Sequence, residues 1–213
     1  MDIITIDFET YYAQDYTLSS MTTEAYIRDA RFEVILASIK VNDAPTFWLL
    51  PDRLDPFLRN EIDWDNTACL AHHAHFDLAI LSWHYNVRPA MILCTLSCAR
   101  VLDGPKARNS LRDLCIRHGV GFKGDYVTTA KGKRLADFTK EELQLYGKYC
   151  CDDSDRTYDL AMKFLPQMPM DELKLVDLTV RFFTEPIFVG DIAKLDGAVV
   201  TERERKRALL VRL

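Results

Sequence analysis

Residues 3–10 read IITIDFET, an apolar run in which two carboxylates appear only toward the end. A short run of this kind is typical of a buried strand, so we predict a strand over Ile3 to Phe8. Successive side chains of a strand point to opposite faces, so Asp7 and Glu9 point to the same side at its end. The stretch therefore predicts a strand at whose edge two like charges meet.

Two further acidic blocks follow far along the chain. Asp77 ends the motif AHHAHFD, and the block YCCDDSDRTYDL supplies Tyr149 and Asp153. The last two are four residues apart in a predicted helix, so they share one face. Bringing the four acids together without a cation would raise their pKa values by mutual repulsion. Two divalent cations remove that cost, and oxygen ligands favour the hard ions Mg²⁺ and Mn²⁺.

Each block also has a simpler interpretation. Asp7 and Glu9 could form a solvated strand edge, and Asp77 could stabilise the start of the following helix. Tyr149 could be a packed core residue and Asp153 an exposed acid. The three blocks together favour catalysis, because they supply the carboxylates that two-metal hydrolysis of a phosphodiester requires.

The order DxE, a motif ending in FD, and YxxxD resembles the DEDD superfamily of 3′→5′ exonucleases in its tyrosine-bearing subtype. The segments DFETYY, MTTEAYIRDARFEVI, LCTL and RFFTEP resemble the proofreading domain of phage-type family A DNA polymerases. This resemblance covers most of the chain. It implies a ribonuclease H-like fold and two divalent cations, Mg²⁺ or Mn²⁺, as cofactors.

The resemblance also implies a role for each matching residue. Asp7, Glu9 and Asp153 would hold the metal that activates the attacking water. Asp7 would bridge to a second metal, which Asp77 would hold largely through water. Tyr149 would orient the nucleophilic water.

Substrate contacts are implied less uniformly. Thr10 would contact the terminal nucleotide beside the metals. His73 stands where such motifs usually carry Asn, and this departure leaves the local substrate contact open. Phe76, like Phe8 and Tyr11, is a candidate to stack the terminal base, and each of the three could instead belong to the core.

The charge of the chain is unevenly distributed. Its net charge is −5, yet residues 100–134 carry nine basic and three acidic side chains. Such a segment attracts phosphates, so Lys131, Lys133 and Arg134 are predicted to bind the strand. The alternative is a solvated loop that carries these basic residues by accident.

Three histidines, His72, His73 and His75, have a spacing that could suggest zinc, but no second ligand group of matching spacing follows. Zinc is therefore the lesser alternative. We expect His84 and His118 to be structural.

The six cysteines form no CxxC pair, which favours reduced thiols and a cytoplasmic location, including the cytoplasm of an infected host cell. No apolar run approaches eighteen residues, so we expect no membrane partner.

Strand-like and helix-like segments alternate along the chain. This alternation predicts an α/β fold with a central mixed β-sheet flanked by helices. Thr139 and Glu142 form a capping box that opens a long helix carrying Tyr149 and Asp153. The predicted strands are 3–8, 33–41, 46–50, 68–71 and the edge strand 91–94, and the predicted helices are 52–59, 76–85, one capped by Thr95, and 110–117.

We predict an exonuclease domain over residues 1–169 and a helical extension over 170–213. Leu173, Val176, Val180 and Phe183 have helical spacing, and Asp191 is predicted to cap a last charged helix. In the polymerases that the chain resembles, such a segment leads into the polymerase body. The chain is accordingly either a piece of a polymerase or a stand-alone exonuclease.

The predicted function is a metal-dependent 3′→5′ exodeoxyribonuclease. It would release 5′-mononucleotides from single-stranded or frayed DNA ends, in proofreading during DNA replication, with DNA and a DNA polymerase domain as partners. Two alternatives stay open: an RNA-trimming exonuclease of the DEDD type, since the acids do not sense the 2′-hydroxyl, and a non-catalytic module that binds nucleic acid or tethers a polymerase.

Overall fold

The central element of the computed structural model, which describes residues 1–121 and 130–210, is a five-stranded sheet. Its strand order is β3-β2-β1-β4-β5. The middle strand β1 is antiparallel to β2 and parallel to β4, so the sheet is mixed, as predicted. β5 is an edge strand, also as predicted. The strands are β1 (Asp2–Thr10), β2 (Val34–Val41), β3 (Phe47–Leu49), β4 (Thr67–Ala71) and β5 (Met91–Cys94).

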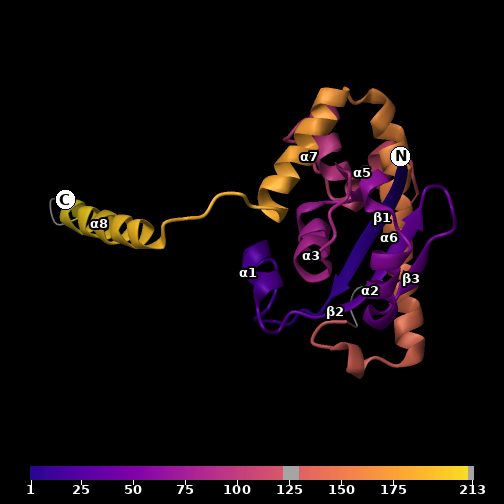
Figure 1. Cartoon of the computed structure of the whole chain (residues 1–213), viewed down its shortest axis with the longest axis horizontal. Coiled ribbons are helices and arrows are strands. Elements are labelled where there is room, and N and C mark those ends of the chain that lie inside the picture. Colours follow the sequence, from indigo (N-terminus) through magenta and orange to yellow (C-terminus); the bar gives the residue numbers. More distant parts are fainter. Residues whose placement is uncertain (122–129, 211–213) are drawn as a thin grey trace.

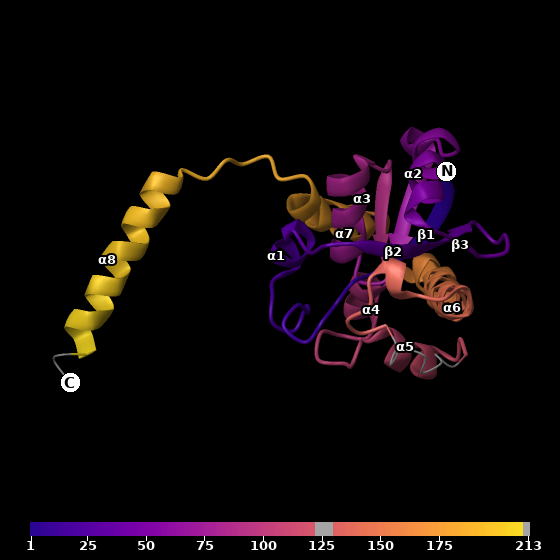
Figure 2. The same cartoon turned by 90° about the horizontal axis from the view of Figure 1, so that it is seen from below.

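Helices cover both faces of the sheet (Figure 2). Ile4, Ile6 and Phe8 of β1 pack into one core with α2, α3 and α7. The opposite face of β1 carries Asp7 and Glu9 and is covered by α6, with α4 and α5 beside it. The helices are α1 (Thr23–Arg28), α2 (Pro51–Asn60), α3 (His75–Tyr85), α4 (Thr95–Leu102), α5 (Leu111–His118), α6 (Lys140–Phe164), α7 (Met170–Thr184) and α8 (Ile192–Leu210).

The long helix α6 begins as the sequence predicts. Thr139 accepts a hydrogen bond from the backbone N–H of Glu142, and the Glu142 carboxylate accepts one from the backbone N–H of Thr139. The helix then lies against β2 and β1, where the Ser38 and Ser154 hydroxyls are 2.7 Å apart. Gly147 allows close approach to β3, because a Cβ there would overlap the indole ring of Trp48.

Two helix starts differ from the sequence predictions. The short helix α1 was not predicted: Thr22 caps it, and burial of Tyr26 and Ile27 stabilises it. The prediction that Thr95 caps α4 is wrong, because Cys94 occupies the cap position and makes no side-chain cap. Thr95 is instead buried, with its hydroxyl oxygen 2.9 Å from Nδ1 of His72.

The two C-terminal helices differ in their packing. Leu173, Val176 and Val180 of α7 are buried against the body of the protein, beside β5 and α3. α8 is exposed along its length and stands apart from that body (Figure 1). Asp191 caps it, as predicted, by accepting a hydrogen bond from the backbone N–H of Lys194 at 3.1 Å. The domain boundary at residues 169/170 stays a prediction.

No disulfide joins any of the six cysteines, all of which lie among the described residues. His84 stacks on Phe32, and His118 lies 2.8 Å from a carboxylate oxygen of Asp103, so both have structural contacts. In the ranges 1–121 and 130–210, no helix is both long and apolar enough to cross a membrane.

Candidate active site

The end of β1 brings together side chains from two elements. Asp7 and Glu9 leave β1 on the face covered by α6, where Cys150 meets them. One potential ligand atom from each of these three residues lies within 4.8 Å of the others. Between Glu9 and Thr10 the pairing with β2 shifts by one residue, which indicates a β-bulge. Bulges redirect side chains and are frequent beside active sites.

Asp77 approaches the same place from the other side of β1. It lies in the first turn of α3, and its carboxylate accepts a hydrogen bond of 3.1 Å from the backbone N–H of Phe8. Burial raises the pKa of Asp77 well above its ordinary value, and the negative charge of Asp7 raises it further. The contribution of Asp7 to the raised pKa of Asp77 agrees with the prediction from the sequence that these acids repel one another.

Asp153 and Tyr149 lie on α6, both nearly inaccessible to solvent. Asp153 follows Cys150 by three residues, so it shares the face of the helix that meets Asp7. Tyr149 belongs to a buried cluster with Ile35 and Leu36 of β2. Its predicted role in orienting water stays a prediction.

A second tyrosine on the same helix, Tyr146, contacts the acids directly. Its hydroxyl donates a hydrogen bond of 2.6 Å to Oε2 of Glu9. Burial, and then the charge of Glu9, raises the pKa of Tyr146, so the phenol stays a donor. The sequence reasoning missed this residue, although Tyr146, Cys150 and Asp153 follow one another at helical spacing on one face.

Cys150 is the other residue that sequence reasoning missed. Its thiol donates to the backbone carbonyl of Asp7 and lies 3.3 Å from Oδ2 of the same residue. Burial raises the pKa of this thiol, and the charges of Asp7 and Glu9 add to the effect. The neutral thiol therefore acts as a donor that holds Asp7 against α6.

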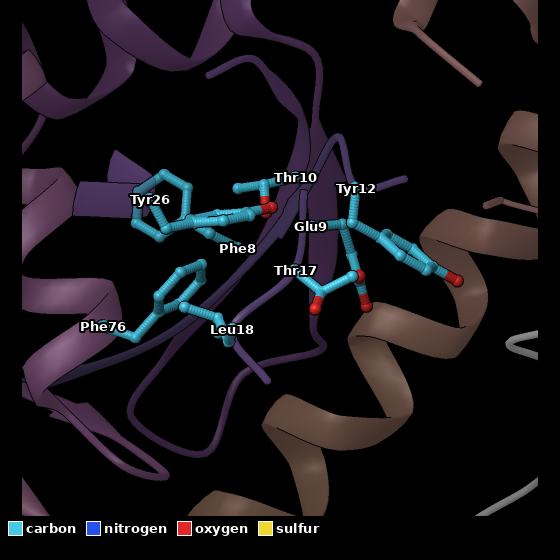
Figure 3. A pocket seen from close by; sticks show the side chains of 8 residues that line it. All are labelled: Phe8, Glu9, Thr10, Tyr12, Thr17, Leu18, Tyr26 and Phe76. Atoms are coloured by element: carbon cyan, nitrogen blue, oxygen red, sulfur yellow. The ribbon is translucent and has the colours of Figure 1, made fainter. Parts of the chain in front are cut away.

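A pocket of about 230 Å³ opens beside Glu9 (Figure 3). Glu9 lines this pocket and also belongs to the group of potential metal ligands with Asp7 and Cys150. A group bound in the pocket would therefore lie next to the carboxylates. Its walls are largely aromatic: Phe8, Tyr26 and Phe76 lie on one side of Glu9 and Tyr12 on the other. Thr10, Thr17 and Leu18 complete the lining.

Thr10, predicted to contact the terminal nucleotide, lies in this pocket with its hydroxyl 2.8 Å from that of Tyr26. The Tyr26 hydroxyl donates to the backbone carbonyl of Tyr11 at 2.5 Å, which uses its one proton. Thr10 must then donate to Tyr26, and the remaining lone pairs of its oxygen can accept from a ligand.

His73 lies in the loop between β4 and α3 and adopts a left-handed backbone conformation with φ 63°. Asn and His are both enriched in this conformation, which gives a physical reason why His can stand where related motifs carry Asn. Burial lowers the pKa of His73, with a smaller effect from Arg100. The His73 ring contacts that of His75, and His72 bonds Thr95, so the three histidines do not converge on one centre.

The predicted strand-binding residues adjoin Gly132 in the sequence, and the backbone N–H of Gly132 donates to the backbone carbonyl of Tyr12 at 2.8 Å. Lys131 is exposed. Lys133 pairs with Glu142 at 2.5 Å. Arg134 pairs with Glu33 at 2.6 Å and lies over the ring of Tyr11. Lys123 and Asp125 of the same predicted basic segment fall outside the described residues.

The donor set at the end of β1 fits a divalent cation. Most of its donors are carboxylates. Burial and the negative charge of Asp7 both raise the pKa of Asp77, and a bound cation would relieve this cost of ionising the carboxyl group. Asp7 and Glu9 supply the carboxylate oxygens of this group, their charges add to the raised pKa of Asp77, and Asp153 lies on the helix that covers them. The one sulfur ligand, Cys150, is the softer donor.

No protein-family model matches the sequence, and no curated protein matches it. Solved structures do resemble its fold. NrnC of Brucella melitensis aligns with a TM-score of 0.58 at 16% identity over 85% of this chain and 81% of that one. Trypanosoma brucei RNase D in complex with the RNA U12 aligns with a TM-score of 0.65 at 14% identity, over 88% and 66%.

Escherichia coli RNase D, described as an exoribonuclease involved in structured RNA processing, aligns with a TM-score of 0.55 at 15% identity, over 87% of this chain and 46% of that one. Identities this low establish a shared fold and nothing finer. None of these three proteins is described as a polymerase, so the resemblance to proofreading domains and to the tyrosine subtype stays a prediction. The predicted fold class is confirmed: a mixed sheet flanked by helices, of the ribonuclease H-like kind.

Proposed function

We propose that this chain is a metal-dependent 3′→5′ exonuclease. The observation that carries the proposal is the meeting of Asp7, Glu9 and Asp77 at the end of β1, with Asp153 on the helix that covers them. Their fold is shared with ribonucleases, and one of the related structures is of NrnC with bound Mg²⁺. Spacing in the sequence and position in the fold thus support the same site.

The residues divide into those that would hold cations and those that would place the substrate. Asp7, Glu9 and Asp153 would bind the first cation, and Asp7 and Asp77 the second. Bound there, Mg²⁺ or Mn²⁺ supplies a water of lowered pKa and neutralises charge that develops on the phosphate oxygens. Tyr149 is retained as the proposed residue that orients the water.

The aromatic pocket would hold the terminal nucleotide. A base stacks on Phe, Tyr and Trp rings whatever its sequence, as a trimming enzyme requires. Phe76 and Tyr12 lie on either side of Glu9, and Thr10 presents acceptor lone pairs that a sugar hydroxyl could donate to. A nucleotide so placed would bring its phosphate toward Asp7.

DNA and RNA are both candidate substrates. The sequence resemblance favours DNA, whereas the related structures favour RNA: one of them is bound to pGG and another to the RNA U12. None of the four acids identifies the sugar. We therefore propose exonuclease action on single-stranded 3′ ends. DNA proofreading is the first candidate only if a polymerase accompanies the chain. RNA trimming is the second candidate.

A digestion assay tests this proposal. DNA and RNA oligonucleotides of one sequence, labelled at the 5′ end, are incubated with the protein in Mg²⁺, in Mn²⁺ and in EDTA. A 3′→5′ exonuclease gives a ladder of shortened labelled products that EDTA abolishes. The faster of the two ladders identifies the sugar.

Two controls make the result decisive. Asp153→Asn should remove the ladder while leaving the fold intact, which excludes a contaminating nuclease. Binding of both oligonucleotides without cleavage in either metal would contradict the proposal and favour a non-catalytic binding module.

A further inference from the structure

A tyrosine other than the one that the sequence motif selects bonds one of the carboxylates. Tyr146 and Tyr149 are both buried on α6 and belong to the same cluster. Tyr146 donates to Oε2 of Glu9 at 2.6 Å, a bond to a charged acceptor that is stronger than one between neutral groups. The Tyr146 hydroxyl is therefore placed to act on a metal-binding carboxylate.

Resting on the proposed function, we propose that Tyr146 is a positioning residue that holds Glu9 in the orientation in which it binds the catalytic cation. A carboxylate has about four lone-pair sites, so Oε2 can accept from Tyr146 and still bind a metal. Groups that hold a metal-binding side chain by a hydrogen bond typically change metal affinity or activity 10- to 100-fold when they are removed.

The surroundings of Tyr146 keep its hydroxyl in place. Its ring stacks on Phe138, with centroids 5.6 Å apart and planes at 11°. The ammonium of Lys133 lies over the Phe138 ring, 5.5 Å from its centroid. Lys133 also pairs with Glu142, which lies on α6 like Tyr146. The stacked ring of Phe138, itself covered by Lys133, limits the rotamers open to Tyr146 and so supports the hydroxyl that donates to Glu9.

Direct cation binding tests this role without any nucleic acid. Mn²⁺ binding is followed by electron paramagnetic resonance for the unmodified protein, Tyr146→Phe and Tyr158→Phe, with thermal unfolding in EDTA as the check of folding. Tyr146→Phe should weaken Mn²⁺ binding roughly tenfold or more. Tyr158→Phe is the matched control, since it removes a tyrosine hydroxyl from the same helix about three turns beyond Tyr146, and it should bind Mn²⁺ like the unmodified protein.

A second background shows whether Tyr146 acts through Glu9. In Glu9→Gln the charged acceptor is removed, so adding Tyr146→Phe should have little further effect on Mn²⁺ binding. An equal weakening in both backgrounds, or Mn²⁺ affinity within twofold of the unmodified protein for a folded Tyr146→Phe, would overturn the proposal. If Tyr146→Phe does not fold, Phe138→Leu replaces it. This variant keeps the Tyr146 hydroxyl but removes the aromatic ring that stacks on Tyr146. Unchanged Mn²⁺ affinity would again refute the role.

The outcome is separable from that of the proposed function. Weakened Mn²⁺ binding by Tyr146→Phe in a protein that cleaves no oligonucleotide would support the positioning role and refute the exonuclease. Cleavage by the unmodified protein together with normal Mn²⁺ binding by Tyr146→Phe would do the reverse. Half-saturating Mg²⁺ in the digestion assay should rise for Tyr146→Phe, whereas Tyr149→Phe should lower turnover at saturating Mg²⁺.

Discussion

The acidic end of β1 and the basic residues 131–134 differ in how the fold accommodates their charges. Asp77 and Asp153 are almost wholly buried. Lys133 and Arg134 keep 31% and 45% of their side chains exposed, and each already pairs with a glutamate. Burying like charges has a cost that an outside cation can relieve, whereas paired surface charges are nearly neutral to folding.

The contrast indicates which region the reaction depends on. Changes among the acids should act on metal binding and turnover, because those carboxylates carry the repulsion that a cation relieves. Changes among the basic residues should act weakly on strand binding, because a phosphate must compete with Glu142 or Glu33 for them.

Asp153→Asn should reduce turnover at saturating Mg²⁺ by roughly a thousandfold or more, because a metal-bound transition state loses several kcal/mol of stabilisation. The substitution keeps the volume of the side chain, so unfolding temperature should change little. Asp152→Asn, one residue earlier on the helix, is the control and should leave turnover within about twofold. Turnover is measured by release of labelled mononucleotide, and near-normal release by Asp153→Asn would remove this residue from the site.

Gly147→Ala should destabilise the protein by about 1–3 kcal/mol, since a Cβ would overlap the Trp48 indole and move α6 away from β3. That movement also displaces the helix that carries Asp153, so turnover should fall as well. Gly197→Ala is matched to it: this glycine lies in the exposed helix α8 with no atom within 4 Å of an added Cβ. There alanine should stabilise the helix by up to about 1 kcal/mol. Denaturant unfolding of both variants decides between these expectations.

Asp77→Asn should change how stability depends on pH. Burial and the charge of Asp7 raise the pKa of Asp77 above its ordinary value of 3.8. A carboxyl whose pKa is raised on folding contributes stability below its unfolded pKa and loses that contribution as the pH rises through the folded value. In EDTA the unmodified protein should therefore lose stability relative to Asp77→Asn above about pH 4, by about 1.4 kcal/mol for each pH unit between the unfolded and the folded pKa.

Mg²⁺ should reverse that difference, because it favours the ionised carboxylate. Asp52→Asn, an exposed acid in the first turn of α2, serves as the control and should show neither effect. Parallel stability curves for Asp77→Asn and the unmodified protein from pH 4 to 8 would show that Asp77 does not carry the repulsion. Urea unfolding at each pH, with and without Mg²⁺, supplies the measurement.

Neutralising Lys131, Lys133 and Arg134 to Gln should have the smallest effect. Removing one contact to a phosphate should reduce the slope of log affinity against log salt by about 0.7 on a single strand, with turnover at saturating substrate preserved. Arg203, Lys206 and Arg207 of α8, changed to Gln together, match the change in charge at a distance from the site. Fluorescence anisotropy in Ca²⁺, which suppresses cleavage, gives both slopes. Equal slopes would show that residues 131–134 do not hold the strand.

The sequence predicted the elements whose signals are local. The apolar run in IITIDFET, the capping box of Thr139 and Glu142 and the cap at Asp191 all depend on residues within one turn or one strand, and all are confirmed. Helix α1 was missed because its six residues are too few to show the helical spacing of apolar side chains. Its stability comes from burying Tyr26 and Ile27. The supposed cap at Thr95 failed because its hydroxyl bonds a histidine 23 residues away.

Two features of the site could be derived from the sequence alone: Asp7 and Glu9 share one side of a strand, and Tyr149 and Asp153 share one face of a helix. Whether Tyr146 meets Glu9 depends on the rotation of α6 about its axis. That rotation is set by contacts distant in sequence, between Ser38 and Ser154 and between Trp48 and Gly147. Local spacing determines which side chains share a face, but only the packing of helix against sheet decides what they touch, and here it places Tyr146 on Glu9.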